Sequence, residues 1–180
     1  IRIWHENVEG GCCTGDEVFY DVRAFCNDIV IPYYSVDFAD QYYDRVFKHF
    51  LQEYKKGRTP NPDVLCNKEI KFAPFVKHAL SMGADYIATG HYCDILHDGD
   101  GLNYLLKAKD SNKDQTYFLN QLSSPQLDKV LFPVGKLDKR EVRDLAAKYG
   151  LSTAEKKDST GICFIGERNF RKFLSEYIPM

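Results

Sequence analysis

The sequence has no long hydrophobic run, no leader-like segment and no Cys-x-x-C pair. No apolar stretch approaches the ~18 residues that a membrane-spanning helix needs, so we expect a soluble protein with no membrane partner. No initiator Met and no basic, signal-like segment stands at the start. The chain opens at Ile1 as if a strand were already under way and ends at Met180, just past an amphipathic helix. These ends are typical of a piece of a longer protein.

The six cysteines match no zinc-site spacing, and we predict no metal site held by the protein. Cysteines without such patterns indicate a reducing compartment and thiols with separate roles. Cys26 lies on the apolar face of an expected helix, and Cys93 follows an expected strand, so both are interpreted as packing residues. Cys12 and Cys13 lie in a glycine-rich loop and receive no role.

Neither sign of charge is in excess, with 24 basic and 26 acidic residues and a net charge of −2. This balance neither favours nor excludes a polyanionic partner, because a basic patch can be local. With 180 residues and 44% hydrophobic content, the chain can bury one substantial core and a small appendage.

Helical and strand patterns alternate along the first half of the chain. Helices are expected from Asp16 onward, over 40–56 with Gly57 as the C-cap, and through Phe75 to Leu80, where Pro74 interrupts the helix. Strands are expected over 29–38 and 86–89, with a short one over 104–108. The alternation predicts a parallel sheet with helices on both faces, followed by a mostly helical second half.

Gly90 and His91 directly follow the expected strand over 86–89. In open parallel sheets, ligands bind beyond the carboxyl ends of the strands, so this is a candidate binding position. The simpler interpretation of His91 is a loop histidine hydrogen-bonded to backbone. The polar run over 109–115 is likewise interpreted by default as a solvated loop.

Residues 57–72 place an acid, a thiol and several cations close together. Asn61-Pro62 is a helix-start signal, because Asn caps free backbone N–H groups and Pro is tolerated in the first turn. Asp63 and Cys66 are three residues apart and therefore share a helical face. The helix N-terminus and two nearby lysines favour a thiolate, which the charge of Asp63 opposes. The pattern fits a nucleophilic cysteine, and it fits a cap followed by a small buried thiol equally well.

Glycines at 161 and 166 flank Cys163, so we expect this thiol to lie in a loop that can move. The helix after it carries apolar residues at 170, 173, 174 and 177, which would anchor one end of the loop to a core. A loop cysteine between basic residues is a weak signal when it stands by itself.

Four motifs occur in the order and approximate spacing of the tRNA-specific 2-thiouridylases. They are Gly-Arg-Thr-Pro-Asn-Pro-Asp-Val-Leu-Cys-Asn-Lys over 57–68, Ala-Thr-Gly-His-Tyr over 88–92, Lys-Asp-Gln over 113–115 and Asp-Ser-Thr-Gly-Ile-Cys-Phe-Ile-Gly over 158–166. The resemblance runs essentially from Ile1 to Met180. Members of that family adenylate the 2-carbonyl oxygen of the wobble uridine with ATP and replace it with sulfur carried as a cysteine persulfide.

The resemblance implies a partial doubly wound parallel sheet of the adenine nucleotide alpha hydrolase-like, ATP-pyrophosphatase type. Residues 1–108 would form an incomplete nucleotide-binding α/β domain. Residues 109–180 would form a mostly helical, tRNA-facing region with the Cys163 loop.

The resemblance also assigns roles to individual residues. Cys163 resembles the persulfide-bearing cysteine, Cys66 the partner nucleophile that leaves a disulfide with it, and Asp63 the acid/base. The segment that surrounds the target base corresponds to Asn61, Pro62 and Asp63. The positions that face the tRNA correspond to His91, Lys113, Asp114 and Gln115, and those at the nucleotide to Gly90 and Ile1. We expect both sulfurs to open onto the cleft beyond Thr89.

The family's N-terminal strand, its Ser-Gly-Gly-Val-Asp-Ser pyrophosphate loop and its β-rich C-terminal domain are absent from this sequence. Because that loop supplies phosphate-binding N–H groups, we expect the fragment by itself to be inactive.

For the intact protein the resemblance implies ATP with Mg²⁺, a persulfide sulfur donor, tRNA, and a cysteine desulfurase or relay protein as partner. The expected location is the cytoplasm or an organelle matrix. The alternatives are another ATP-pyrophosphatase-type adenylating enzyme and a non-catalytic RNA-binding or redox fragment.

Overall fold

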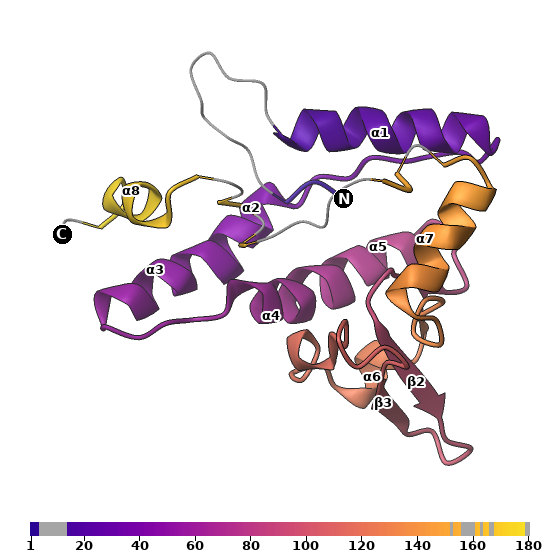
Figure 1. The fold of residues 1–180 in the computed structure, drawn as a ribbon. Helices are drawn as coiled ribbons and strands as arrows, with labels where there is room; N and C mark the ends of the chain where they lie inside the picture. Colours follow the sequence, from indigo (N-terminus) through magenta and orange to yellow (C-terminus); the bar gives the residue numbers. More distant parts are fainter. Residues whose placement is uncertain (4–13, 152, 156–160, 163, 166–167, 179–180) are drawn as a thin grey trace.

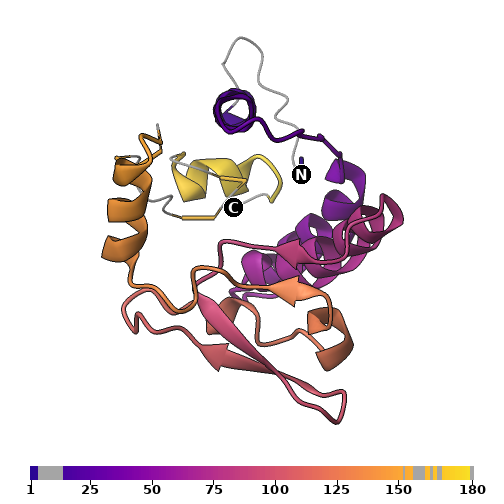
Figure 2. The ribbon, with the colours of Figure 1, turned by 90° about the vertical axis from the view of Figure 1, so that its right-hand side faces the viewer.

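The computed structural model describes residues 1–3, 14–151, 153–155, 161–162, 164–165 and 168–178 (Figure 1). Helix α1 (Thr14–Asp28) lies at one end of the molecule, and a β-hairpin lies at the other (Figures 1 and 2). The helix predicted from Asp16 onward is therefore confirmed.

The strand predicted over 29–38 is wrong apart from one parallel bridge between Arg2 and Asp37. The Arg2 N–H donates to the carbonyl of Val36 and the Phe38 N–H donates to the carbonyl of Arg2, each at 2.7 Å. Val30 interrupts the extended backbone with a φ of 55°. A strand needs a continuous ladder of partners, and the described residues supply this segment with only one.

The helix predicted over 40–56 is confirmed as a continuous span of α2 (Ala39–Tyr42), η1 (Tyr43–Phe47) and α3 (Lys48–Lys55). Gly57 ends it with a φ of 73°, as a C-terminal glycine should. Within this span Tyr43 is 45% exposed, whereas Tyr42 is fully buried. The wider turn of the π-helical segment η1 changes which residues face the core.

A second helical span consists of α4 (Pro62–Cys66), η2 (Asn67–Phe75) and α5 (Val76–Ser81). We call it the central rod, because it runs across the middle of the molecule in Figure 1. Its backbone departs from helical geometry at Phe72, two residues before Pro74. The interruption expected from that proline is thus present.

Two small sheets follow the central rod. The predicted strand at 86–89 is present as β1 (Ile87–Ala88), which pairs in parallel with β4 (Val130–Leu131). Strands β2 (Cys93–His97) and β3 (Asn103–Lys107) form an antiparallel hairpin, whose turn contains Gly101 at a φ of 81°. In the described residues the parallel sheet is therefore one pair of short strands, and the extended doubly wound sheet stays a prediction.

After residue 108 the described regular structure is helical apart from the two-residue strand β4, but turns and loops make up much of this half, so the mostly helical region stays a prediction. This half contains η3 (Thr116–Phe118), α6 (Ser124–Leu127), α7 (Lys139–Lys148) and α8 (Phe170–Ser175). Helix α7 begins with reciprocal capping between Asp138 and Glu141. The division into domains at residue 108 stays a prediction.

Apolar side chains form two buried clusters. The first core joins the long helical span, the central rod and the C-terminal segment, and it consists of Phe38, Tyr42, Val46, Phe47, Phe50, Cys66, Ile70, Phe164, Ile165 and Phe173. The second core joins the rod to the small sheets and consists of Phe72, Cys93, Leu119, Leu127, Val130 and Phe132. The central rod therefore contributes to both cores.

Candidate functional site

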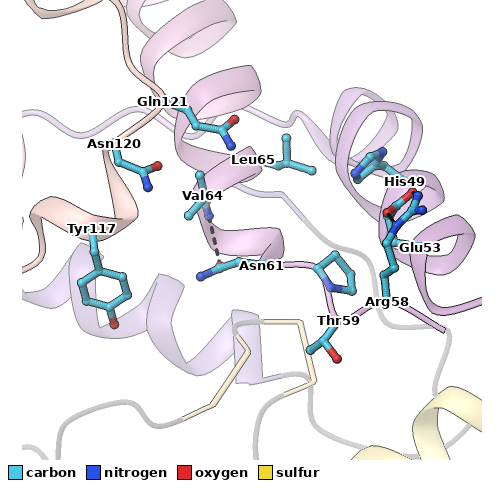
Figure 3. Close-up of a pocket in the computed structure, with 11 residues that line it drawn as sticks. His49, Glu53, Arg58, Thr59, Asn61, Val64, Leu65, Tyr117, Asn120 and Gln121 are labelled. Atoms are coloured by element: carbon cyan, nitrogen blue, oxygen red, sulfur yellow. Dashed lines mark hydrogen bonds and ion pairs between the residues drawn. The ribbon is translucent and has the colours of Figure 1, made fainter. Parts of the chain in front are cut away.

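A cleft of about 450 Å³ opens beside the start of α4 (Figure 3). It is lined by His49, Glu53, Arg58, Thr59, Pro60, Asn61, Val64, Leu65, Tyr117, Asn120 and Gln121. Three segments thus meet here, namely helix α3, the start of the central rod and the turn over 117–121. A cleft of this size can take a nucleotide-sized ligand.

The start of α4 is built as the sequence predicts. The Asn61 Oδ1 accepts hydrogen bonds from the N–H groups of Asp63 at 3.1 Å and Val64 at 3.3 Å. Pro62 is buried at the first helical position, and Asp63 beside it is half-buried. Since the cap uses the Asn61 oxygen, its amide nitrogen remains on the cleft side, directed towards Tyr117 in Figure 3.

Cys66 lies in the first core and is 1% exposed. The expectation that its sulfur opens onto a cleft is therefore wrong for this conformation. Cys66 and Ile70 are one helical turn apart, and the stripe that they share packs into the first core. The proposed role of Cys66 as a nucleophile thus requires that this core open.

Cys163 lies outside the described residues. The residues around it, Ile162, Phe164 and Ile165, all join the first core. The Phe164 ring contacts those of Phe47 and Phe50 edge-on, with centroids 5.4 and 5.3 Å apart. The fold therefore brings the residues that flank Cys163 into the core that contains Cys66.

His91 is held between aromatic rings next to the carboxyl end of β1. Its centroid lies 5.8 Å from that of Phe72 and 6.4 Å from that of Phe132, and its Nδ1 is 2.9 Å from the Thr89 hydroxyl oxygen. Burial, with a smaller contribution from the charge of Lys71, lowers the pKa of His91 to about 4. The ring is neutral near pH 7, so a contact with tRNA would be a hydrogen bond rather than an ion pair.

Residues 113–115 form hydrogen bonds that connect neighbouring loops. Asp114 accepts hydrogen bonds from the N–H groups of Ala108 at 2.7 Å and Thr116 at 3.2 Å, and from the Thr116 hydroxyl. Gln115 and Tyr92 exchange two bonds, because the Gln115 N–H donates to the Tyr92 carbonyl and the Gln115 Oε1 accepts from the Tyr92 N–H. Lys113 is half-buried. These bonds give Asp114 and Gln115 structural tasks, and the tRNA-facing role of the run stays a prediction.

The two residues expected at the nucleotide are both accessible. Gly90 is exposed, and a side chain added to it would meet no atom within 4 Å, so a ligand can approach its backbone. Ile1 is also exposed. The nucleotide-binding role of these two residues stays a prediction.

The described residues contain no cluster of three metal-ligating side chains. Mg²⁺ is commonly held by substrate phosphates and only one or two carboxylates. Within the same residues, every helix is too short or too polar to cross a bilayer.

Among the predicted site residues that the structure describes, Asn61 alone lines the cleft. The sequence analysis missed His49, Glu53, Arg58, Tyr117, Asn120 and Gln121. Two of them had a usable signal, since Arg58 lies inside the first motif and Tyr117 stands two residues after the 113–115 run.

Arg58 and Glu53 form an ion pair at the rim of the cleft. Arg58 donates to Glu53 from Nε and, at 2.7 Å, from Nη2, and Lys56 Nζ donates to the same carboxylate at 3.3 Å. The hydrogen bonds from Arg58 lower the pKa of Glu53 to about 2. The carboxylate is therefore charged throughout the physiological range, and it holds Arg58 in one orientation.

Comparison with known proteins agrees with the four motifs. Residues 1–167 match the family described as the tRNA methyl transferase HUP domain, an α/β, nucleotide alpha hydrolase-like class. The tRNA-specific 2-thiouridylases MnmA of Staphylococcus haemolyticus and Staphylococcus epidermidis are each 62% identical over 99% of this chain and 48% of their own length. The enzyme of the same name from Streptococcus sanguinis is 60% identical over the same shares. The chain spans about half the length of these relatives, and it belongs to the family of the tRNA-specific 2-thiouridylases.

Proposed function

We propose that the intact protein, of which this chain forms a part, replaces the 2-oxygen of the wobble uridine of tRNA with sulfur. The observation that carries this proposal is the first core, which joins Cys66 to the residues on both sides of Cys163. The names of the relatives support tRNA as the substrate. The sulfur would come from a cysteine desulfurase or a relay protein, and the expected location is the cytoplasm.

When bound, ATP would supply the activation, because adenylation turns the 2-oxygen of uracil into a good leaving group. Gly90 and Ile1 would lie at the nucleotide. Mg²⁺ would be held mainly by the phosphates of ATP. The terminal sulfur of a Cys163 persulfide would then form a bond to carbon 2 as AMP leaves. Asp63 would accept the proton released from that sulfur.

The transferred sulfur, now bonded to the base, would be separated from Cys163 in a second step. The Cys66 thiolate would attack the Cys163 sulfur, break its bond to the transferred sulfur and leave a Cys66–Cys163 disulfide. An external dithiol would reduce that disulfide and complete the cycle. Over the cycle one sulfur atom would replace one oxygen atom, that oxygen would leave on AMP, and the external dithiol would supply the two electrons that reduce the disulfide.

The burial of Cys66 sets a condition on this mechanism. Phe164 and Ile165 cover part of the first core, and they belong to the segment that carries Cys163. A displacement of this segment would therefore expose Cys66 and move Cys163 in a single event. We propose that tRNA binding to the intact protein drives that displacement.

The test uses the full-length protein with Cys66→Ser and Cys163→Ser, each assayed for 2-thiolation of tRNA. Both variants should lose at least about 100-fold in rate, because no other group can replace a thiol in sulfur transfer. Cys26→Ser is the matched control, since Cys26 is a half-buried thiol on α1, and it should keep wild-type activity. Full activity in both test variants would refute the assignment.

Mass spectrometry checks the persulfide directly. Incubation of the intact protein with a cysteine desulfurase and cysteine should add one sulfur atom at Cys163, and persulfide only at other cysteines would contradict the proposal.

The burial of Cys66 also supports a second candidate, another ATP-pyrophosphatase-type adenylating enzyme in which Cys66 only packs. Such an enzyme needs no paired thiols, so it would retain its activity in both cysteine variants.

A further inference from the structure

One wall of the cleft has no role in the proposed sulfur chemistry. It consists of Tyr117, Asn120 and Gln121, which lie opposite His49, Glu53 and Arg58 in Figure 3. Tyr117 is 55% exposed, although an aromatic ring of this size is usually better covered. Phe118 lies against it, with ring centroids 3.9 Å apart and planes at 33°. Tyr117 therefore presents a ring that is supported from one side and accessible from the cleft.

This wall is fixed in place by side-chain hydrogen bonds. The buried Asn67, which directly follows Cys66, donates from Nδ2 to the Phe118 carbonyl at 3.1 Å. Asp114 binds the backbone and the hydroxyl of Thr116, at the start of the same turn. The backbone that carries Tyr117 thus has a defined position relative to α4 before any ligand arrives, which reduces the entropy cost of binding.

The chemistry of this wall is that of a nucleobase site. Proteins bind unpaired bases by stacking them on aromatic rings and by hydrogen bonding to their edges, and side-chain amides can donate to and accept from those edges. Across the cleft, the Asn61 oxygen caps α4, so Asn61 offers its amide N–H groups. Those donors suit the carbonyl oxygens of uracil.

We propose that Tyr117 stacks on the target uracil and that Asn120 hydrogen-bonds to its edge. This inference rests on the proposed function, because it assigns the cleft to the base that is modified. It adds Tyr117 and Asn120 to the residues at the target base and explains why Asp114 and Asn67 hold this turn so firmly.

The test measures binding of the full-length protein to an anticodon stem-loop RNA that contains the wobble uridine. Tyr117→Ala should weaken binding by roughly 5- to 150-fold, the range for loss of one base–aromatic stack. Tyr117→Phe should bind within about threefold of wild type, because stacking needs only the ring. The matched control is Tyr104→Ala, an exposed tyrosine on β3 away from the cleft, which should bind as wild type does.

A second RNA separates a base contact from a general effect. With a stem-loop that lacks only the wobble base, wild type and Tyr117→Ala should bind equally well. A loss of the same size on that RNA would overturn the proposal, because the tyrosine would then contact the backbone or support the fold. A change confined to the KM for ATP would also overturn it, because the cleft would then take adenine.

The edge contact has its own variant. Asn120→Ala should weaken binding of the uridine stem-loop by about 5- to 20-fold and leave binding of the abasic RNA unchanged. Asn112→Ala, in the exposed loop before the turn, is the control. If wild-type protein bound the stem-loop but did not thiolate tRNA, the proposed function would fail, and these binding results would still decide the role of the wall.

Discussion

Among single residues, Cys66 combines a predicted chemical role with a position in the first core. A thiol that is 1% exposed reacts with an alkylating reagent only when its surroundings open. We expect iodoacetamide to modify Cys66 at least about tenfold more slowly than the half-buried Cys26 in the folded protein. Peptide mapping after timed alkylation gives both rates.

Phe164→Ala tests whether the C-terminal segment covers Cys66. Removing this buried ring should destabilise the protein by about 3–5 kcal/mol and bring the alkylation rate of Cys66 close to that of Cys26. Phe132→Ala is the matched control, because it removes a buried ring from the second core. An equal acceleration in both variants would show that Cys66 reacts only through global unfolding.

His91 should make stability depend on pH in a range where few other groups titrate. Its folded pKa of about 4 lies below the value of ~6.5 expected in the unfolded chain, so the unfolded state binds more protons between these values. The contribution of the neutral His91 ring to the free energy of unfolding is complete above pH 6.5. It is lost as the pH falls towards 4, by up to about 3 kcal/mol.

Urea unfolding between pH 4 and pH 8 measures this dependence. His91→Gln should flatten it, whereas His97→Gln, at the exposed end of β2, should retain the wild-type slope. A steep slope that survived in His91→Gln would assign the effect to other groups.

At the scale of elements, the turn over 113–118 depends on the Asp114 carboxylate. Asp114→Asn replaces one accepting oxygen with a donor that faces donors, which should cost about 1–3 kcal/mol of stability. Burial by itself raises the pKa of Asp114, but the hydrogen bonds from Thr116 and Ala108 outweigh it and leave the pKa lowered. The stabilisation is therefore complete above about pH 4 and is lost as the pH falls through the lower folded value.

Thermal unfolding at neutral pH and at pH 3 checks both statements. Asp128→Asn, an exposed carboxylate paired only loosely with Lys129, should change stability by less than about 0.5 kcal/mol. If Asp114→Asn changed stability as little as Asp128→Asn, the turn would not depend on this carboxylate.

The helices could be predicted from the sequence because their signals are local. Asn61 and Asp138 cap the helices that follow them, and Gly57 ends the helix before it, each within a few residues of the pattern that it closes. Strand β4 could not be predicted, since two residues become a strand only through pairing with β1. The segment over 29–38 has the composition of a strand but lacks the partners that would make it one.

In the candidate site, too, features with a local sequence signal could be predicted and features that depend on distant segments could not. The Asn61 cap was predictable, whereas the opposite wall at Tyr117 exists only because hydrogen bonds and packing bring a distant turn to α4. The burial of Cys66 had a local sign, its spacing of one helical turn from Ile70. That spacing does not reveal whether the shared stripe faces a cleft or a core, which is a property of the tertiary fold.

For the whole molecule, the two cores divide the motifs between them. The first core holds Cys66 and the residues beside Cys163, and the second holds Cys93 and Phe72, whose ring lies against that of His91. Burial, with a smaller contribution from the charge of Asp114, raises the pKa of Cys93 to about 12, so this thiol stays protonated near pH 7 and donates to the His91 carbonyl at 3.8 Å. The sulfur chemistry that we propose therefore involves the first core. The polar turn over 113–118 lies next to the second core.

Asn67 connects these two regions. It is the residue after Cys66, and its side chain holds the turn that carries Tyr117, while its own Oδ1 is buried without a hydrogen-bond partner among the described residues. A motion of α4 that exposes Cys66 would carry Asn67 with it and so alter the wall of the cleft. Thiol exposure and cleft shape are thus linked variables in the thermodynamic sense. A ligand that the cleft binds more tightly when Cys66 is exposed must, by the same factor, favour exposure of Cys66.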